Sequence, residues 1–292
     1  MAVINTNVAA QISANALAKN DRAMTVSMQR LATGTRINSA SDDAAGLAVA
    51  SKLTSQVRGL GQAVRNGNDA IAVLQTVDGA ATEVSNMLQR MRELTVQGGT
   101  GTLSSTDLTA LNTEFVALQT EIDRIATNTQ WNGDALLDGT AGDFGNLTFQ
   151  VGYEANQTIT VNIGDWNNAA FTTAAVWATG ATANDVYGSA ISTLSMTTAT
   201  LANTALGFID TAIAGVDSQR ATVGAAINTL EFAVDNLANA SQNTQAARSR
   251  IADADYAAET TELARTQIIA QAATAMLSQA NQQSLSVMAL LK

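Results

Sequence analysis

The sequence predicts a mainly α-helical protein. We expect an elongated rod of long antiparallel helices, with terminal coiled-coil helices, and with a β-hairpin and a small irregular lobe at the outer end. Apolar residues recur every three or four positions along most of the chain, which is typical of helices that bury one face. The 292 residues include no proline, so long helices are not interrupted. Apolar and polar residues alternate only within 144–166, which indicates strands.

Heptad repeats predict a helix at each end of the chain. Near the N-terminus, residues seven apart are Val3, Ala10, Leu17, Met24 and Leu31. Near the C-terminus, one heptad position holds Leu263, Ala270, Leu277, Ser284 and Leu291, and the position three residues later holds Thr266, Ala273, Ala280 and Val287. We predict that the terminal helices pack through Val3, Leu17, Met24, Leu31, Leu263, Leu277, Val287 and Leu291.

These heptad positions leave two interpretations open. In the first, the two terminal helices pair as a coiled coil inside one monomer. In the second, they are largely disordered in the monomer and fold when neighbouring molecules cover them. We favour the second interpretation, because positions filled by Ala and Thr bury little apolar area and isolated helices are marginally stable in water.

Polar residues predict a joint between the first two helical segments. The Ser-Asp-Asp run at 41–43 comes directly before the helix-forming run 44–53. The side-chain oxygen atoms of this run can accept hydrogen bonds from the free backbone N–H groups at the start of the helix. Asp253 and Asp255 predict a matching joint near the other end of the chain. The glycine and the glutamate of a calcium-binding loop are missing there.

Three apolar stripes predict a three-helix core in the middle of the chain. They run over 71–94, 108–125 and 206–237, and a shorter helical segment at 52–65 precedes them. Helices of roughly 27 residues would be about 40 Å long. Arg220 occupies an apolar position of the third stripe, where its stem can pack while its guanidinium reaches solvent.

A change of period predicts strands and a lobe after the second stripe. Residues 147–151 and 159–163 alternate apolar with polar side chains, and 152–157 supplies a turn, which predicts a β-hairpin. Residues 167–199 have no firm period. Because eight of the twelve aromatic residues lie within 131–187, we expect a small aromatic lobe here.

The composition argues against several classes of function. The chain has no histidine and no cysteine, so it lacks a Ser–His–Asp triad and the usual zinc ligands. Asp42 and Asp43 are a carboxylate pair of the kind used in glycoside hydrolysis, but their position before a helix favours capping. We predict no catalytic, cofactor-binding or metal-binding residues and no cofactor. The net charge of −10 argues against nucleic acid and anionic membranes as partners.

The first residues, MAVINTNVAAQ, lack the basic region and the apolar core of a secretory signal peptide. We expect no window of the chain to be apolar enough, for long enough, to cross a bilayer. The residues therefore predict a protein without a membrane partner that the general secretory pathway does not export.

Segments at opposite ends of the chain carry a family resemblance. RLATGTRINSASDDAAGLAVASKL at 30–53 resembles the N-terminal signature of bacterial flagellin, and ARSRIADADY at 247–256 and QANQQSLSVMALLK at 279–292 resemble the C-terminal signature. The resemblance covers 1–165 and 200–292. It implies a structural subunit, not an enzyme, that polymerises with copies of itself into a helical filament for motility, with folding of the terminal helices coupled to assembly.

The resemblance also implies a domain organisation of a short flagellin. In chain order, its parts are an N-terminal helix of the filament-core domain (1–43), a rod domain with helices and a hairpin at 144–166 (44–166), a small outer lobe (167–199), the C-terminal helix of the rod domain (200–252), and a C-terminal helix of the filament-core domain (253–292). The lobe is too short for a complete outer domain.

Partners and location follow from the same resemblance. It implies an extracellular flagellar filament whose subunit leaves the cell by the flagellar type III secretion route, with no cleaved signal peptide. A dedicated export chaperone would bind the C-terminal segment, and the filament cap and junction proteins would be further partners.

One segment resembles a recognition site. LQRMREL at 88–94 is similar to the flagellin segment that the animal Toll-like receptor for flagellin recognises, and Glu114 matches a further determinant. The resemblance implies that Arg90, Leu94 and Glu114 contact this receptor and lie between stacked subunits of a filament. The helical pattern alone assigns Leu94 to the apolar stripe and Arg90 to an ordinary solvated surface, so both interpretations stay open.

Three other functions compete with the filament subunit. A hook–filament junction protein has similar terminal helices but forms a ring of a few subunits. A filament subunit with an inserted enzyme would need more residues, and more acidic or metal-binding ones, than 167–199 provides. Binding of a surface polysaccharide by the aromatic lobe is supported by aromatic crowding alone.

Overall fold

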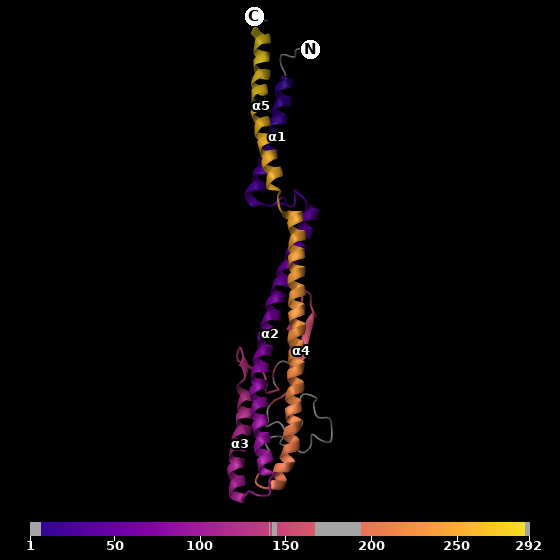
Figure 1. Cartoon of the computed structure of the whole chain (residues 1–292). Helices are drawn as coiled ribbons and strands as arrows, with labels where there is room; N and C mark the ends of the chain where they lie inside the picture. Colours follow the sequence, from indigo (N-terminus) through magenta and orange to yellow (C-terminus); the bar gives the residue numbers. More distant parts are fainter. Residues whose placement is uncertain (1–6, 140, 142–144, 167–193, 290–292) are drawn as a thin grey trace. The chain divides into compact units, whose positions relative to one another are not determined.

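The structure is a computed structural model, and it describes residues 7–139, 141, 145–166 and 194–289. These residues form five helices and four short strands (Figure 1). The elements are α1 (Val8–Thr33), α2 (Ala44–Gly98), α3 (Ser105–Asn128), β1 (Gln130–Trp131), β2 (Asp134–Ala135), β3 (Asn146–Gln150), β4 (Thr158–Asn162), α4 (Ala199–Ala252) and α5 (Tyr256–Ala289). The prediction of a mainly α-helical fold is confirmed.

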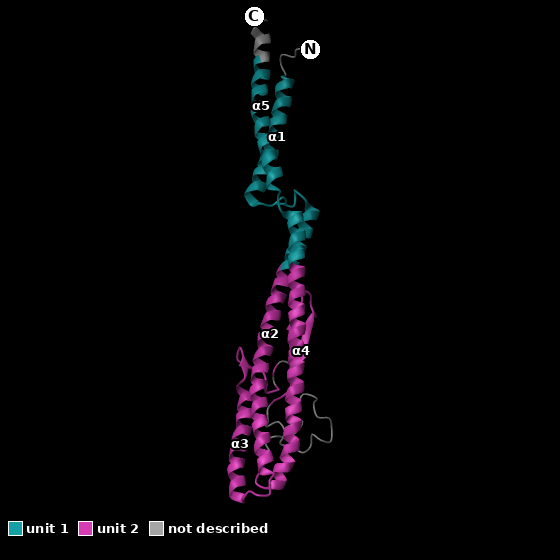
Figure 2. Cartoon of the chain, in the orientation of Figure 1, with its two compact units in different colours: residues 1–57, 242–292 teal, residues 58–241 magenta. Residues whose placement is uncertain are grey.

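The chain divides into two compact units, each built from both halves of the sequence (Figure 2). Unit 1 comprises residues 1–57 and 242–292, and unit 2 comprises 58–241. The predicted joints separate α1 from α2 and α4 from α5, whereas the units divide within α2 and within α4. The five-part domain organisation therefore stays a prediction. Most of the predicted outer lobe, 167–193, lies outside the described residues.

Unit 1 contains an antiparallel pair of helices, α1 and α5, which lie side by side in Figure 1. Asn7 Nδ2 donates to the carbonyl oxygen of Ala280 at 3.0 Å, and Asn20 Nδ2 donates to the carbonyl oxygen of Thr266 at 2.8 Å. Later residues of α1 therefore contact earlier residues of α5, as in an antiparallel pair. This is the geometry of the first interpretation, in which the ends pair within one chain.

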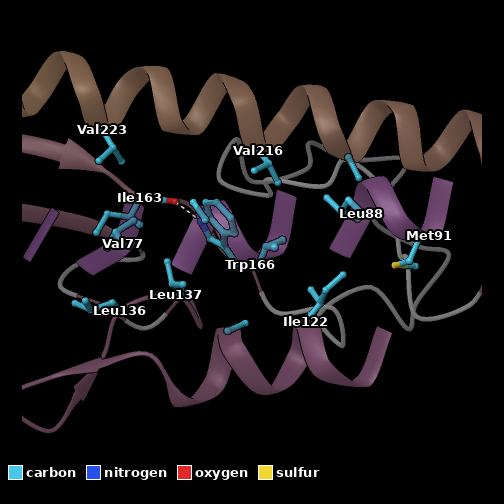
Figure 3. Close-up of a cluster of buried hydrophobic side chains, with 14 of the residues drawn as sticks. Val77, Leu88, Met91, Ile122, Leu136, Leu137, Ile163, Trp166, Val216 and Val223 are labelled. Carbon is cyan, nitrogen blue, oxygen red and sulfur yellow. Dashed lines mark hydrogen bonds between the residues drawn. The ribbon is translucent and has the colours of Figure 1, made fainter. Parts of the chain in front are cut away.

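Unit 2 has a core formed by α2, α3 and α4 together with the hairpins. The three predicted stripes supply it. Its fully buried members include Val77, Leu88, Met91, Ile122, Leu137, Ile163, Trp166, Val216 and Val223 (Figure 3). Ion pairs join α2 to the other two helices in antiparallel order. They are Arg90 with Glu114, Arg92 with Asp210, and Asp78 with Arg220.

Trp166 lies in this core and not in a lobe. Its side chain has no exposed surface, and its Nε1 donates to the carbonyl oxygen of Ile163 at 2.7 Å (Figure 3). The aromatic count that indicated a lobe included Trp166, although the predicted lobe itself begins at residue 167. The indole fits the core because its one polar group is satisfied by the backbone three residues earlier.

The predicted separate segment at 52–65 does not exist as an element. α2 is continuous for 55 residues and α4 for 54, about twice the predicted length. The apolar stripe marks only the part of each helix that faces the core, and without proline the helix continues beyond it. The glycines of α2 allow close packing: a Cβ at Gly67 would lie 2.5 Å from Val234 Cγ2.

The predicted hairpin is confirmed. β3 and β4 pair antiparallel, with Leu147 opposite Val161 and Phe149 opposite Ile159. A second hairpin, β1–β2, was not predicted. Its two turn residues, Asn132 and Gly133, have φ values of 54° and 94°, as a two-residue turn with left-handed residues requires.

The expectation that no window of the chain is apolar enough to cross a bilayer is wrong for α4. By length and composition it could cross a membrane, with an 18-residue window of mean hydropathy 1.3. Its apolar side lies in the core of unit 2, where Ile209, Ala212 and Val216 are fully buried. A buried core helix passes the same test, so this window is weak support for a membrane span.

We predict that Leu88→Ala lowers the free energy of unfolding of unit 2 by about 2–5 kcal/mol, because it leaves a cavity where the side chain has no exposed surface. Chemical denaturation followed by circular dichroism measures this change. Leu201→Ala is the control, because Leu201 is 44% exposed and its truncation should cost less than about 1 kcal/mol. Equal losses in the two variants would contradict the assigned core.

Candidate assembly and recognition surfaces

The two polar joints of unit 1 are hydrogen-bonded to each other. The backbone N–H of Arg36 donates to the carbonyl oxygen of Ala252 at 2.7 Å, and the N–H of Ala254 donates to the carbonyl oxygen of Gly34 at 3.0 Å. The guanidinium of Arg36 also donates to the carbonyl oxygen of Ile251 at 2.7 Å. The joints are therefore one structure made from two distant parts of the chain.

One acidic residue of each joint caps a helix. Asp43 Oδ1 accepts from the N–H of Gly46 at 2.8 Å, and Asp255 Oδ1 accepts from the N–H of Ala257 at 2.9 Å. Backbone hydrogen bonds from Ser39 and then Asn38 hold the pKa of Asp42 below its ordinary value. The predicted capping role is confirmed for Asp43, whereas Asp42 accepts from the N–H groups of Asn38 and Ser39, which precede the helix. Among the described residues, no group of three or more acidic side chains could hold a metal ion.

Packing of the terminal helices through the eight predicted residues stays a prediction, and five of these side chains are described. Leu17, Met24 and Leu31 are half-buried on α1, as are Leu263 and Leu277 on α5. Val3 and Leu291 lie outside the described residues, and Val287 is described only as part of the α5 backbone.

Sequence analysis missed two polar residues of the α1–α5 pair, Asn20 and Ser27, although it placed Thr266 at a heptad position. Asn20, Ser27 and Thr266 are buried, with exposed fractions of 9%, 2% and 1%. Asn20 and Ser27 sit three residues after Leu17 and Met24, which is the second apolar position of a heptad. The heptad spacing alone could have found them. Burial of these polar groups makes the α1–α5 contact weaker than an apolar one.

The remaining surface of the two helices is rich in exposed apolar side chains. Residues more than half exposed are Val8, Ile12, Met28, Tyr256, Ile268 and Met276. Single apolar residues scattered over a surface are normal, but this helix pair exposes several large ones. Surfaces of that kind mark contact sites.

A charged cluster on unit 2 contains two of the three predicted recognition residues. Arg90 Nε donates to Glu114 Oε1 on α3 at 2.8 Å, and Arg90 Nη1 donates to Glu93 Oε2 at 2.8 Å. The hydrogen bond to Glu114, followed by that to Glu93, raises the pKa of Arg90. The Arg90 and Glu114 side chains are 49% and 46% exposed, so the pair is open to a partner. Sequence analysis missed Glu93, although its i, i+3 spacing from Arg90 was visible.

Leu94 does not belong to this surface. It is 1% exposed and is part of the unit 2 core. A four-residue spacing turns the helix by only about 40°, but Arg90 reaches outward from the edge of the stripe while Leu94 faces inward. A partner that binds the chain in this conformation cannot contact Leu94. The assignment of Leu94 as a contact residue is therefore corrected: it is a core residue.

Comparison with known proteins assigns a family. A family model of the bacterial flagellin N-terminal helical region matches residues 4–142, and one of the bacterial flagellin C-terminal helical region matches 206–291. The flagellin of Bacillus subtilis (strain 168) is 42% identical over 99% of this chain and 99% of its own length. The flagellin of Halalkalibacterium halodurans is 41% identical over 99% of this chain and all of its own length.

A solved structure shares the fold. A putative flagellar hook-associated protein from Vibrio parahaemolyticus has a TM-score of 0.55, covering 73% of this chain and 100% of its own. Its 17% identity supports the fold alone, so the junction-protein alternative is not favoured over a flagellin. The family matches at both ends, with relatives at 41–42% identity over nearly the whole length, show that this chain belongs to the bacterial flagellin family.

Proposed function

We propose that folding of unit 1 is coupled to assembly of the flagellar filament. As a flagellin, the chain is a structural subunit that polymerises into this extracellular filament. The proposal concerns how polymerisation proceeds: unit 2 is folded in the monomer, and the terminal helices become stable when copies of the chain cover them.

The distribution of buried apolar residues carries the proposal. Among the described residues, unit 1 buries only two apolar side chains, Ile37 and Ala50, each 8% exposed. All the other buried apolar residues, including every large one with no exposed surface, belong to unit 2. Apolar burial is the main source of folding free energy, so unit 2 has a core of its own and unit 1 does not.

The exposed apolar side chains of α1 and α5 provide the missing burial. Ile12, Met28, Ile268 and Met276 bury less than half of their surface in the monomer, because each stays more than half exposed. Contact with neighbouring copies removes them from water at about 25 cal/mol per Å² of apolar surface. Ordering the helices costs conformational entropy, and this added burial offsets that cost only in the polymer.

We predict that polymerisation increases the helical content of the chain. Far-ultraviolet circular dichroism of the full-length monomer, compared with that of filaments made from the same sample, measures the increase. The added signal should come from residues of α1 and α5. Hydrogen exchange identifies these residues, because their amides should be protected in filaments and not in the monomer. Equal helicity and equal protection in both states would overturn the coupling.

We predict that Asn20→Leu stabilises the α1–α5 pair in the monomer by about 1–2 kcal/mol, because an apolar side chain replaces a buried amide at the helix contact. Monomer helicity at 222 nm should rise. Asn15→Leu is the matched control, since Asn15 is exposed on the same helix. If both variants raised helicity alike, helix propensity and not burial at position 20 would be the cause.

The cluster of Arg90 and Glu114 is a proposed contact surface between subunits, and also a surface for the animal Toll-like receptor for flagellin. Support comes from the family resemblance of 88–94 and from the exposure of the pair. If stacked subunits cover this surface in the filament, the receptor can reach it only on monomers.

Arg90→Ala should then weaken both receptor signalling and polymerisation, measured by a reporter-cell assay with monomer and by light scattering during assembly. Arg124→Ala is the control, because Arg124 pairs with Glu121 within α3 at similar exposure. An unchanged Arg90→Ala variant in both assays would remove the assignment.

Further partners are proposed on the family resemblance. They are an export chaperone on the C-terminal segment, and the filament cap and junction proteins. Export by the flagellar type III route, with the N-terminal segment as an uncleaved signal, is proposed on the same ground. Export and chaperone binding both need segments that are not held folded. Unit 1 would supply them, because its helices lack an apolar core.

A further inference from the structure

We propose that unit 2 binds small aliphatic amines in a cavity between α2 and the two hairpins. The cavity has a volume of about 680 Å³. Residues of α2, of the β1–β2 hairpin and of β3 line it together with Leu136 and Ala141, all within unit 2. The volume falls in the range of sites that hold small molecules.

The cavity is lined by two acidic side chains that form no ion pair with the described residues. Asp69 on α2 and Asp134 on β2 line it, and neither carboxylate makes an ion pair or a hydrogen bond to a described residue. The basic side chain one turn before Asp69, Arg65, donates to Gln62 Oε1 instead. Residues 58–241 contain 18 acidic and six basic side chains, a net charge of −12, so the surrounding field also attracts cations.

An aromatic ring lies next to one of these carboxylates. Trp131 and Asp134 are cross-strand partners in the β1–β2 hairpin, so their side chains share a face of the ribbon. Trp131 is 38% exposed, and Phe149 of β3 adds a half-buried ring to the lining. Cations bind over the face of Trp more strongly than over other side-chain rings, and a neighbouring carboxylate adds to the attraction.

The walls of the cavity are held in place before any ligand arrives. Asn66 Nδ2 donates to the carbonyl oxygen of Gln150 at 3.1 Å, which ties α2 to β3. The Asn132-Gly133 turn, with both residues at positive φ, fixes the position of Trp131 relative to Asp134. A preformed site loses less entropy on binding than a flexible one.

The lining selects among cations. Calcium takes six to eight oxygen ligands and magnesium six, whereas much of this wall is apolar: Ala70, Val73, Leu136 and Leu147. An alkylammonium ion fits both parts, since its methylene groups contact the apolar wall and its charged ends face the carboxylates and the indole ring. Two carboxylates favour a diamine over a monoamine.

The test is isothermal titration calorimetry of the full-length monomer with 1,5-diaminopentane at constant ionic strength. We expect saturable binding at one site, and at least tenfold weaker binding of n-pentylamine. Asp134→Asn and Trp131→Ala should each reduce affinity by tenfold or more. Asp217→Asn should leave it unchanged, because it removes the same charge from an exposed position on α4 outside the cavity. Melting curves confirm that each variant stays folded.

Three results would overturn the proposal. One is no saturable binding by the wild-type chain. Another is an equal loss of affinity in Asp134→Asn and Asp217→Asn, which would show a general response to net charge. The third is displacement of the diamine by an equal concentration of Mg²⁺ with no effect of Trp131→Ala, which would show simple ion exchange. Filament formation is measured separately and does not enter these outcomes.

Discussion

Burial of the apolar faces of α2, α3 and α4 against one another is the interaction on which the rest of the structure depends. It places Trp166 and its neighbours out of water, and it fixes the helices that present Arg90 and Glu114. Unit 1 has no comparable core. The buried residues of its α1–α5 pair are Asn20, Ser27 and Thr266, and several of its large apolar side chains are more than half exposed. The chain thus combines a unit that has an apolar core with one that leaves much of its apolar surface exposed.

Much of the fold was predictable because its signals are periodic. The stripes from 71 to 94 and from 206 to 237 match the buried faces of α2 and α4, and the alternation at 147–151 and 159–163 matches β3 and β4. The lengths of α2 and α4 were not predictable from stripes, because a helix with exposed polar and small residues leaves no apolar pattern. The β1–β2 hairpin is too short for alternation, and its Asn-Gly turn was the only available signal.

The candidate surfaces were less predictable than the core. Arg90 and Glu114 were identified by resemblance, which also named Leu94, whereas the helical pattern alone assigned Leu94 to the apolar stripe in which it is buried. The partner of Arg220 was also missed. Its guanidinium donates to Asp78 Oδ1 at 3.0 Å, a contact between residues 142 positions apart. Pairs of that kind depend on how two helices align, which the sequence of either one does not contain.

The hydrogen bond between Asn20 and Thr266 joins residues 246 positions apart. During synthesis, α1 leaves the ribosome long before its partner α5 exists, so unit 1 cannot form on a nascent chain. Unit 2 needs only the residues up to 241, and it can close while the remainder of the chain is still being made. Contacts of such long sequence separation also form slowly, because closing a large loop is entropically expensive. A newly made chain therefore spends its first seconds with an amphipathic N-terminal segment that has no intramolecular partner.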